Sequence, residues 1–225
     1  MKSFALFVTL FLVALPLSAW TMQESCNGSK IMVDAEKRAE IENVCNAVQI
    51  GDNFLTSVGL KLSGDLIVTL VKELPKNGSY HSIGYFNSRS SEIYLLSYEA
   101  ALNASHESVP SFGILMNPPI WGSYVVHELG HFAAQKRFAS GISIRTASEY
   151  IASVAQLATL PSVEREKIIR NYPELSGFDK PEEITMAFYL LDPSKFTVNA
   201  YLHYSKPENG LSFINRLLSE GLSDD

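Results

Sequence analysis

The chain has 225 residues, of which 46% are hydrophobic and 11% aromatic, and its formal net charge at pH 7 is −6. This composition suits one compact domain with a hydrophobic core, and it excludes a largely disordered chain because only 19% of the residues are charged. Basic residues do not cluster along the sequence, so nucleic acid and anionic membrane surfaces are poor candidates for partners.

Residues 1–19 have the layout of a secretory signal peptide. Lys2 gives a positive start, residues 4–15 form an almost unbroken apolar run, and Ala19 is the small residue after which we expect cleavage. The apolar run is shorter than the roughly 20 residues that a membrane-spanning helix needs. We therefore expect an exported protein, periplasmic or secreted, with no stable membrane anchor after cleavage and a single domain over residues 20–225.

The two cysteines, Cys26 and Cys45, are predicted to form a disulfide. An oxidising compartment lets an isolated pair join, and no histidine lies near them to complete a metal site. The bridge would attach the N-terminal segment to the helix that follows it.

The first half of the chain predicts a small sheet. Runs of β-branched and apolar residues indicate strands at 31–33 and 65–72, and residues 75–78 form a turn. Residues 80–86 and 92–98 are expected to pair as a hairpin.

One long helix is expected between the first two strands. Apolar residues recur at helical spacing from Ile41 to Val58. Asp34 stands where an N-cap belongs, and Gly59 is placed to end the helix.

The second half predicts helices. Asn117 is expected to cap a helix that has proline in its first turn and continues to about Arg137. The other expected helices cover residues 147–160, a segment beginning at Pro181, and residues 163–171, 196–204 and 211–220. A sheet followed by helices predicts an α+β fold with an N-terminal sheet and a C-terminal helical lobe.

The motif H-E-L-G-H at residues 127–131 lies inside an expected helix. His127 and His131 stand four residues apart, so both imidazoles project from one helix face and can bind one metal ion. Glu128 lies about 100° around the helix from His127, where it can reach a metal-bound water. The simpler alternative is a helix with two hydrogen-bonded core histidines.

A zinc ion here needs a third protein ligand. The metzincin pattern is excluded, because Ala134 and Arg137 occupy the positions of its glycine and third histidine. Glu149, 18 residues beyond His131, has a separation that suits a ligand from the next helix.

A second interpretation of Glu149 stays open. Thr146 and Glu149 match a capping box, in which Glu149 would only close the start of its helix. In that case Glu164 and His203 are the next candidates for the third ligand.

His127, Glu128 and His131, followed by Glu149 on a second helix, resemble the gluzincin metallopeptidases. The layout is also similar to a poorly characterised group of small exported bacterial proteins with this motif, and the specific match covers residues from about 117 to 160. The resemblance implies a zincin-like fold, one Zn²⁺ bound by His127, His131 and Glu149, and Glu128 as general base acting on a peptide or protein substrate.

The resemblance is incomplete in its supporting residues. Many gluzincins carry an aspartate four residues after the ligand glutamate, where this chain has Ser153. An oxyanion donor is also missing, and His203 and Tyr204 are candidates because gluzincins often draw it from the C-terminal lobe. Core packing of an aromatic helix face would explain these two residues equally well.

Two further expectations depend on this resemblance. By analogy, the strand at 92–98 precedes the zinc helix as the substrate-holding edge strand does in gluzincins. The alternative function, from another class, is a zinc-stabilised binding or interaction protein that keeps the motif without turnover.

Overall fold

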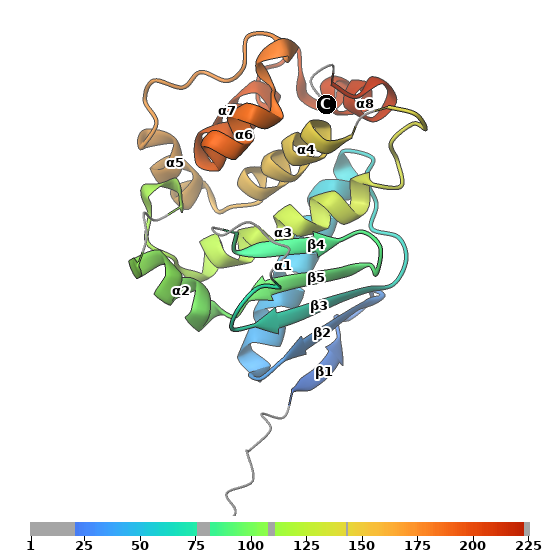
Figure 1. The fold of residues 1–225 in the computed structure, drawn as a ribbon, viewed down its shortest axis with the longest axis vertical. Helices are drawn as coiled ribbons and strands as arrows, with labels where there is room; N and C mark the ends of the chain where they lie inside the picture. The colour runs from blue at the N-terminus through green and yellow to red at the C-terminus, as the bar shows by residue number, and fades with distance from the viewer. Residues whose placement is uncertain (1–20, 76–81, 108–110, 143, 223–225) are drawn as a thin grey trace, which may run out of the picture.

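The computed structural model describes residues 21–75, 82–107, 111–142 and 144–222. The predicted signal peptide and most of the turn predicted at 75–78 lie outside the described residues. The chain has the predicted α+β fold, in which an N-terminal sheet is followed by helices (Figure 1).

The sheet has five strands in the order β1-β2-β3-β5-β4. They are β1 (Met22–Ser25), β2 (Ile31–Ala35), β3 (Leu66–Val71), β4 (Gly84–Asn87) and β5 (Glu92–Leu96). The three central strands are parallel neighbours, and β1 and β4 pair antiparallel at the two edges. The predicted hairpin is therefore present as β4 and β5. The analogy with an edge strand does not fit residues 92–98, because β3 occupies the other side of β5.

One face of the sheet is covered by α1 (Arg38–Ser57) and α3 (Pro118–Ala134), which lie behind it in Figure 1. Buried and half-buried residues alternate along β3, so Leu66, Val68 and Leu70 point into this core. Burial of this apolar face is the main force that holds the sheet on the helices.

The start of α1 differs from the prediction. Asp34 is not an N-cap but belongs to β2, where it lies opposite Thr69 of β3. Pairing with β3 extends β2 to Ala35, beyond the predicted cap. The helix therefore begins at Arg38, with Lys37 in the N-cap position. Gly59 lies just beyond the helix end with a φ of +79°, which confirms its predicted role.

Helix α3 begins as predicted. The side chain of Asn117 accepts a hydrogen bond of 3.0 Å from the backbone N–H of Ile120, and proline occupies the first turn. The buried indole of Trp121 donates a 2.8 Å hydrogen bond to the carbonyl of Leu96 in β5. This bond fixes the first turn of α3 against the sheet.

The remaining helices form the C-terminal lobe, with the exception of α2. They are α2 (Tyr98–Glu107), α4 (Arg145–Ala158), α5 (Ser162–Arg170), α6 (Met186–Leu191), α7 (Pro193–Tyr204) and α8 (Gly210–Glu220). Helix α4 packs against α3 on one side and α7 on the other (Figure 1). Pro181 begins only a 3-10 turn, because Ile184 leaves the helical backbone and Thr185 then caps α6.

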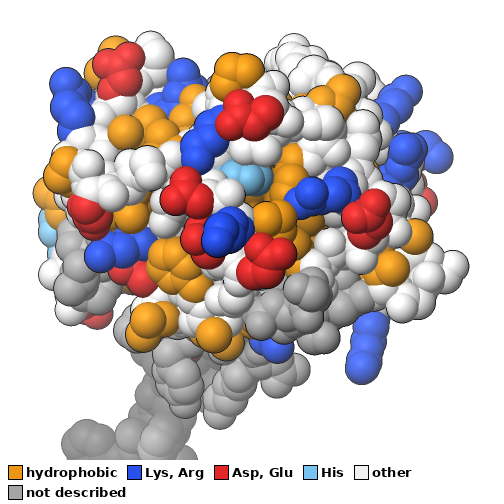
Figure 2. Space-filling model, turned by 90° about the horizontal axis from the view of Figure 1, so that it is seen from above, with side chains coloured by type: hydrophobic (Ala, Val, Ile, Leu, Met, Phe, Trp, Pro, Cys, Tyr) orange, Lys and Arg blue, Asp and Glu red, His pale blue; other side chains and the backbone are white. Residues whose placement is uncertain are grey.

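The surface above the C-terminal helices carries charges of both signs. Figure 2 shows acidic and basic side chains interspersed with hydrophobic ones on this face. Among the described residues, no helix is both long and apolar enough to cross a membrane.

Cys26 and Cys45 form the predicted disulfide, which joins the segment after β1 to helix α1. A bridge of this kind is typical of a protein that folds in an oxidising, exported compartment.

We expect the disulfide to make a large contribution to stability. It closes a loop with a sequence separation of 19 residues, and its replacement by serines, C26S/C45S, should cost about 3 kcal/mol because the unfolded chain gains freedom. This corresponds to a fall in melting temperature of roughly 6–12 °C, measurable by circular dichroism. Wild-type protein in reductant is the control and should melt like the double variant. An unchanged melting temperature in C26S/C45S would contradict the prediction.

Candidate metal centre

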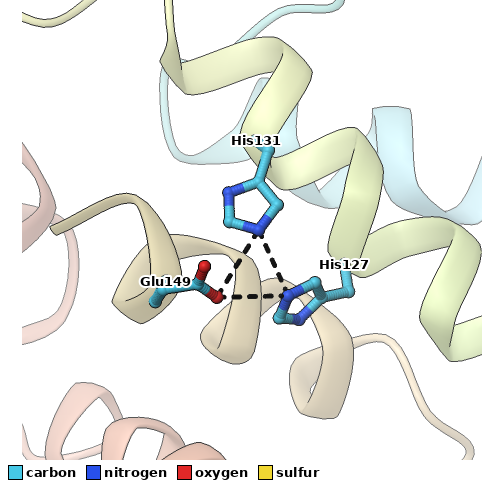
Figure 3. A group of neighbouring side chains, drawn as sticks. All are labelled: His127, His131 and Glu149. Carbon is cyan, nitrogen blue, oxygen red and sulfur yellow. Dashed lines mark hydrogen bonds and ion pairs between the residues drawn. The ribbon is translucent and has the colours of Figure 1, made fainter. Parts of the chain in front are cut away.

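Three side chains from two neighbouring helices converge on one point (Figure 3). His127 and His131 of α3 bring their Nε2 atoms to 3.2 Å from each other. Oε2 of Glu149, on α4, lies 3.5 Å from each of these nitrogens. The structure thus brings together the three residues that were predicted from the sequence to be metal ligands.

The helices that carry these residues approach closely at Gly130. A Cβ atom on Gly130 would lie 2.8 Å from Cα of Ala152 in α4. Gly130 and Ala152 are small enough to allow this close approach of the two helix backbones. The close approach places Glu149 within reach of the histidines.

The three ligand atoms fit a tetrahedral metal ion. Bonds of about 2.0–2.1 Å at tetrahedral angles place ligand atoms about 3.3–3.4 Å apart, close to the observed 3.2, 3.5 and 3.5 Å. Oε2 of Glu149 is also buried without a hydrogen-bond partner among the described residues, an arrangement that costs free energy unless a cation compensates it. The group of His127, His131 and Glu149 could therefore hold a metal ion.

Glu149 does not form the alternative capping box. Helix α4 begins at Arg145 with Ile144 as its N-cap, so Thr146 lies within the first turn and not at the cap position. Burial opposes ionisation of Glu149, but the neighbouring imidazoles outweigh burial and hold the pKa of this carboxyl well below its usual range. The carboxylate is thus in the charged form that a metal ligand requires.

The other candidates for the third ligand have different partners. Glu164 pairs with Lys167 on the same helix, α5, at 3.1 Å. Nδ1 of His203 lies 2.6 Å from the hydroxyl of Tyr150, and burial lowers the pKa of His203 to about 4.

His203 and Tyr204, the candidate oxyanion donors, contribute to core packing. The ring of His203 lies 4.5 Å from that of Phe213, and the ring of Tyr204 lies 6.1 Å from that of Phe54, both edge to face. Neither belongs to the group of residues around the ligand triangle, which agrees with the core-packing interpretation.

A chain of hydrogen bonds fixes the orientation of His127. The hydroxyl of Ser123 donates to the carbonyl of Ile120 at 2.7 Å and accepts from Nε2 of Gln156 at 3.3 Å. Oε1 of Gln156 therefore faces Nδ1 of His127, at 3.1 Å, and can only accept a hydrogen bond from it. With the proton on Nδ1, the lone pair of His127 lies on Nε2, the atom that faces the centre of the triangle.

Ser148 plays the corresponding role for His131. Its Oγ atom lies 2.7 Å from Nδ1 of His131. Ser148, Glu149 and Gln156 all belong to α4, so one helix supplies a ligand and the partners of both histidines. Ser153, which stands where gluzincins carry aspartate, instead bonds Thr197 of α7 at 3.1 Å.

Glu128 is buried between α3 and the sheet. Burial raises the pKa of its carboxyl to about 7; the charge of His127 and a hydrogen bond from the backbone N–H of Phe86 oppose this rise, and the charge of Glu149 adds to it. Glu128 thus lies within electrostatic range of two members of the triangle, next to strand β4.

Tyr189 is a site residue that the sequence analysis missed. Burial together with the charges of Glu149 and Glu128 raises the pKa of Tyr189 well above its usual range, so the Tyr189 hydroxyl lies near the Glu149 carboxylate. The phenol therefore keeps its proton at neutral pH and can donate it in a hydrogen bond. Tyr189 lies on α6, which begins at Met186 and not at Pro181 as predicted.

The centre reaches solvent through two of its residues. The side chains of His131 and Glu149 are 15% and 18% exposed, whereas that of His127 is 9% exposed. The centre is therefore mostly buried but not closed to solvent.

The chain belongs to a protein family of unknown function, DUF6639, whose model matches residues 31–223. Comparisons with curated proteins and with solved structures give no significant match. The matched segment contains every residue of the metal centre, but the family has no known function. The function is therefore inferred from the site itself.

We expect Glu149→Ala to remove most of the stabilisation that added zinc gives. Zinc at a hundred times its Kd should stabilise wild type by about 2.7 kcal/mol, a rise of roughly 5–11 °C in melting temperature. If the variant binds zinc about a hundredfold more weakly, the rise should shrink to less than about 2 °C at the same concentration. The melting temperatures would be measured in chelator and then in excess zinc.

Glu164→Ala is the matched control for this measurement, because Glu164 is a half-buried carboxylate that pairs with Lys167 on its own helix and lies outside the ligand triangle. It should keep the full zinc-dependent rise. A full rise in Glu149→Ala as well would show that Glu149 is not a ligand.

Proposed function

We propose that this chain is an exported zinc-dependent metallopeptidase that hydrolyses peptide bonds by means of an activated water and a glutamate general base. The observation that carries the proposal is the position of Glu128, a buried carboxylate on the same helix as His127 and His131 and within electrostatic range of the triangle. A metal site with a purely structural role needs no such carboxylate, and burial of an acid without a function is unfavourable.

The donor set supports zinc as the metal. Two imidazole nitrogens and one carboxylate oxygen are a ligand set of catalytic zinc sites, which leave the fourth position to water or substrate. A zinc ion bound to His127, His131 and Glu149 would supply Lewis acidity toward the water and the substrate carbonyl.

The surrounding side chains hold the ligands ready for this chemistry. Gln156 accepts a hydrogen bond from Nδ1–H of His127, and Ser148 lies at hydrogen-bond distance from Nδ1 of His131. Both imidazoles can therefore direct an Nε2 lone pair at the metal position. Neutral partners on both histidines replace the carboxylate that many gluzincins use.

Glu128 and Tyr189 have complementary roles in the proposed reaction. Glu128 takes a proton from the attacking water and passes it to the nitrogen of the leaving amine, so that one carboxylate serves as base and then as acid. Tyr189 keeps its phenolic proton and can donate a hydrogen bond to the carbonyl oxygen as negative charge develops on it. It is the candidate for the donor that the sequence did not reveal.

The disulfide supports the proposed location. A Cys26–Cys45 bridge is compatible with the periplasm or the exterior of the cell and not with a reducing cytosol. The substrate would then be a peptide or protein outside the cytoplasm.

One observation favours the alternative, a zinc-stabilised binding or interaction protein. His127 and Glu128 are only 7% and 5% exposed, so a substrate must approach through the partly exposed side near His131 and Glu149. The two functions differ in what the loss of the base does.

Glu128→Gln should keep the fold and the bound zinc but lose hydrolysis by about 10²-fold or more, because the amide cannot accept the proton. Activity would be measured on a library of fluorescence-quenched peptides, and bound zinc by elemental analysis. Glu164→Gln, which alters a half-buried carboxylate of α5 outside the ligand triangle, is the control and should match wild type. Wild-type protein that binds zinc tightly yet cleaves no member of the library would favour the binding protein.

Tyr189→Phe should lower kcat by about 10²-fold and leave zinc affinity within a few-fold of wild type, since only the donor O–H is lost. The phenyl ring keeps its edge-to-face contact with Phe196, at 5.3 Å in wild type. Tyr204→Phe is the control, because Tyr204 packs against Phe54 in the core. If Tyr204→Phe loses activity and Tyr189→Phe does not, the two assignments are reversed.

A further inference from the structure

Strand β4 contacts Glu128 at two positions. The backbone N–H of Phe86 lies near the Glu128 carboxylate and lowers its pKa. At Gly84, an added Cβ would lie 2.8 Å from Oε1 and 3.0 Å from Cγ of the same side chain. Glu128 therefore fills the space that any side chain at position 84 would occupy.

The hydrogen-bond pattern of β4 explains why Phe86 can donate to Glu128. The N–H of Leu96 in β5 donates to the carbonyl of Ile83 at 2.9 Å, so Ile83 directs its carbonyl toward β5. Alternate residues of an antiparallel strand face opposite ways, and Gly84 and Phe86 consequently direct their N–H and C=O groups toward the free edge of the sheet. The Phe86 amide near Glu128 is therefore one that no strand in the described part of the chain uses.

The requirement for glycine at position 84 is steric. Gly84 is absent from the glycines with a φ in the left-handed region, so its backbone conformation is open to alanine. The atoms that an alanine would meet are those of Glu128 and, at 3.1 Å, Cδ1 of Leu95.

We propose that Gly84 and the Phe86 amide are positioning elements for Glu128, so that the free edge of the sheet fixes the orientation of the general base. The contact at Gly84 limits how far the carboxylate can lean toward the sheet, and the Phe86 amide fixes where it points. The functional meaning rests on the proposed function, but the positioning itself is independent of hydrolysis and can be tested without a substrate.

The test is a double-mutant cycle on thermal unfolding of the full chain in chelator. Wild type, Gly84→Ala, Glu128→Ala and the double variant would be compared. Gly84→Ala should lower the melting temperature by roughly 3–10 °C in the wild-type background, as expected for overpacking. In the Glu128→Ala background, which lacks both Oε1 and Cγ, the shift should fall to less than half of this value.

Gly122→Ala is the matched control, because a Cβ there would lie 3.6 Å from Cβ of Ala47, an ordinary contact. Its shift should be the same in both backgrounds. Equal shifts for Gly84→Ala in both backgrounds would overturn the proposal and assign Gly84 to the packing of Leu95. If Gly84→Ala does not fold, recovery of folding in the double variant supports the proposal, and its failure overturns it.

Kinetics and zinc affinity then separate this inference from the proposed function. Gly84→Ala should bind zinc within about threefold of wild type and lose roughly 10–10²-fold in kcat with KM little changed. When Gly84→Ala is combined with Glu128→Gln, it should lower kcat less than twofold further, because both substitutions act on the same carboxylate. If the wild-type protein hydrolyses no peptide, the proposed function is refuted, but the result of the unfolding cycle still tests the positioning of Glu128. If the two substitutions lower kcat independently in the double variant, the proposal that Gly84 positions Glu128 is refuted.

Discussion

The close approach of α3 and α4 is the constraint on which the candidate site depends. The two backbones come within reach of each other because Gly130 faces Ala152, where a Cβ on the glycine would lie 2.8 Å from Cα of the alanine. A larger residue at either position would separate the helices and withdraw Glu149 from the histidines. The two small residues therefore set the size of the ligand triangle, although neither contacts a ligand atom in it.

Helix α4 shows how a buried element can carry a polar site. It packs between α3 and α7, and most of its residues are apolar and buried. Ser148, Glu149 and Gln156 interrupt this apolar surface where α4 faces the histidines. Each polar side chain of the helix in this region has a partner on α3, so the free energy of burying it is offset by hydrogen bonds or by charge.

The groups that would perform the chemistry come from three separate parts of the fold. The histidines and Glu128 lie on α3, the carboxylate ligand on α4, and Tyr189 on α6. The sheet contributes through β4, whose outward amide contacts Glu128. The rigidity of the site thus depends on packing between layers, and each layer fixes one of the groups relative to the others.

The sequence by itself determined the parts of this protein that depend on local order. Helical spacing placed His127 and His131 on one face of a helix, with Glu128 about 100° around it. Asn117 before two prolines identified the cap, and the isolated pair of cysteines identified the disulfide. Periodicity also gave the order of sheet and helices. It failed at Asp34, where pairing with β3 extends the strand, and it did not predict β1 or α2. It also began a helix at Pro181, where the structure has a 3-10 turn followed by α6. Only the tertiary structure showed that Glu149 belongs to the ligand triangle and is not a helix cap. It also showed that Gln156 and Ser148 are the hydrogen-bond partners of the histidines. Finally, it placed Tyr189 near Glu149 and β4 at the edge of the sheet. These contacts join residues that are distant in sequence, and their distances follow from how the layers pack, which no local pattern encodes.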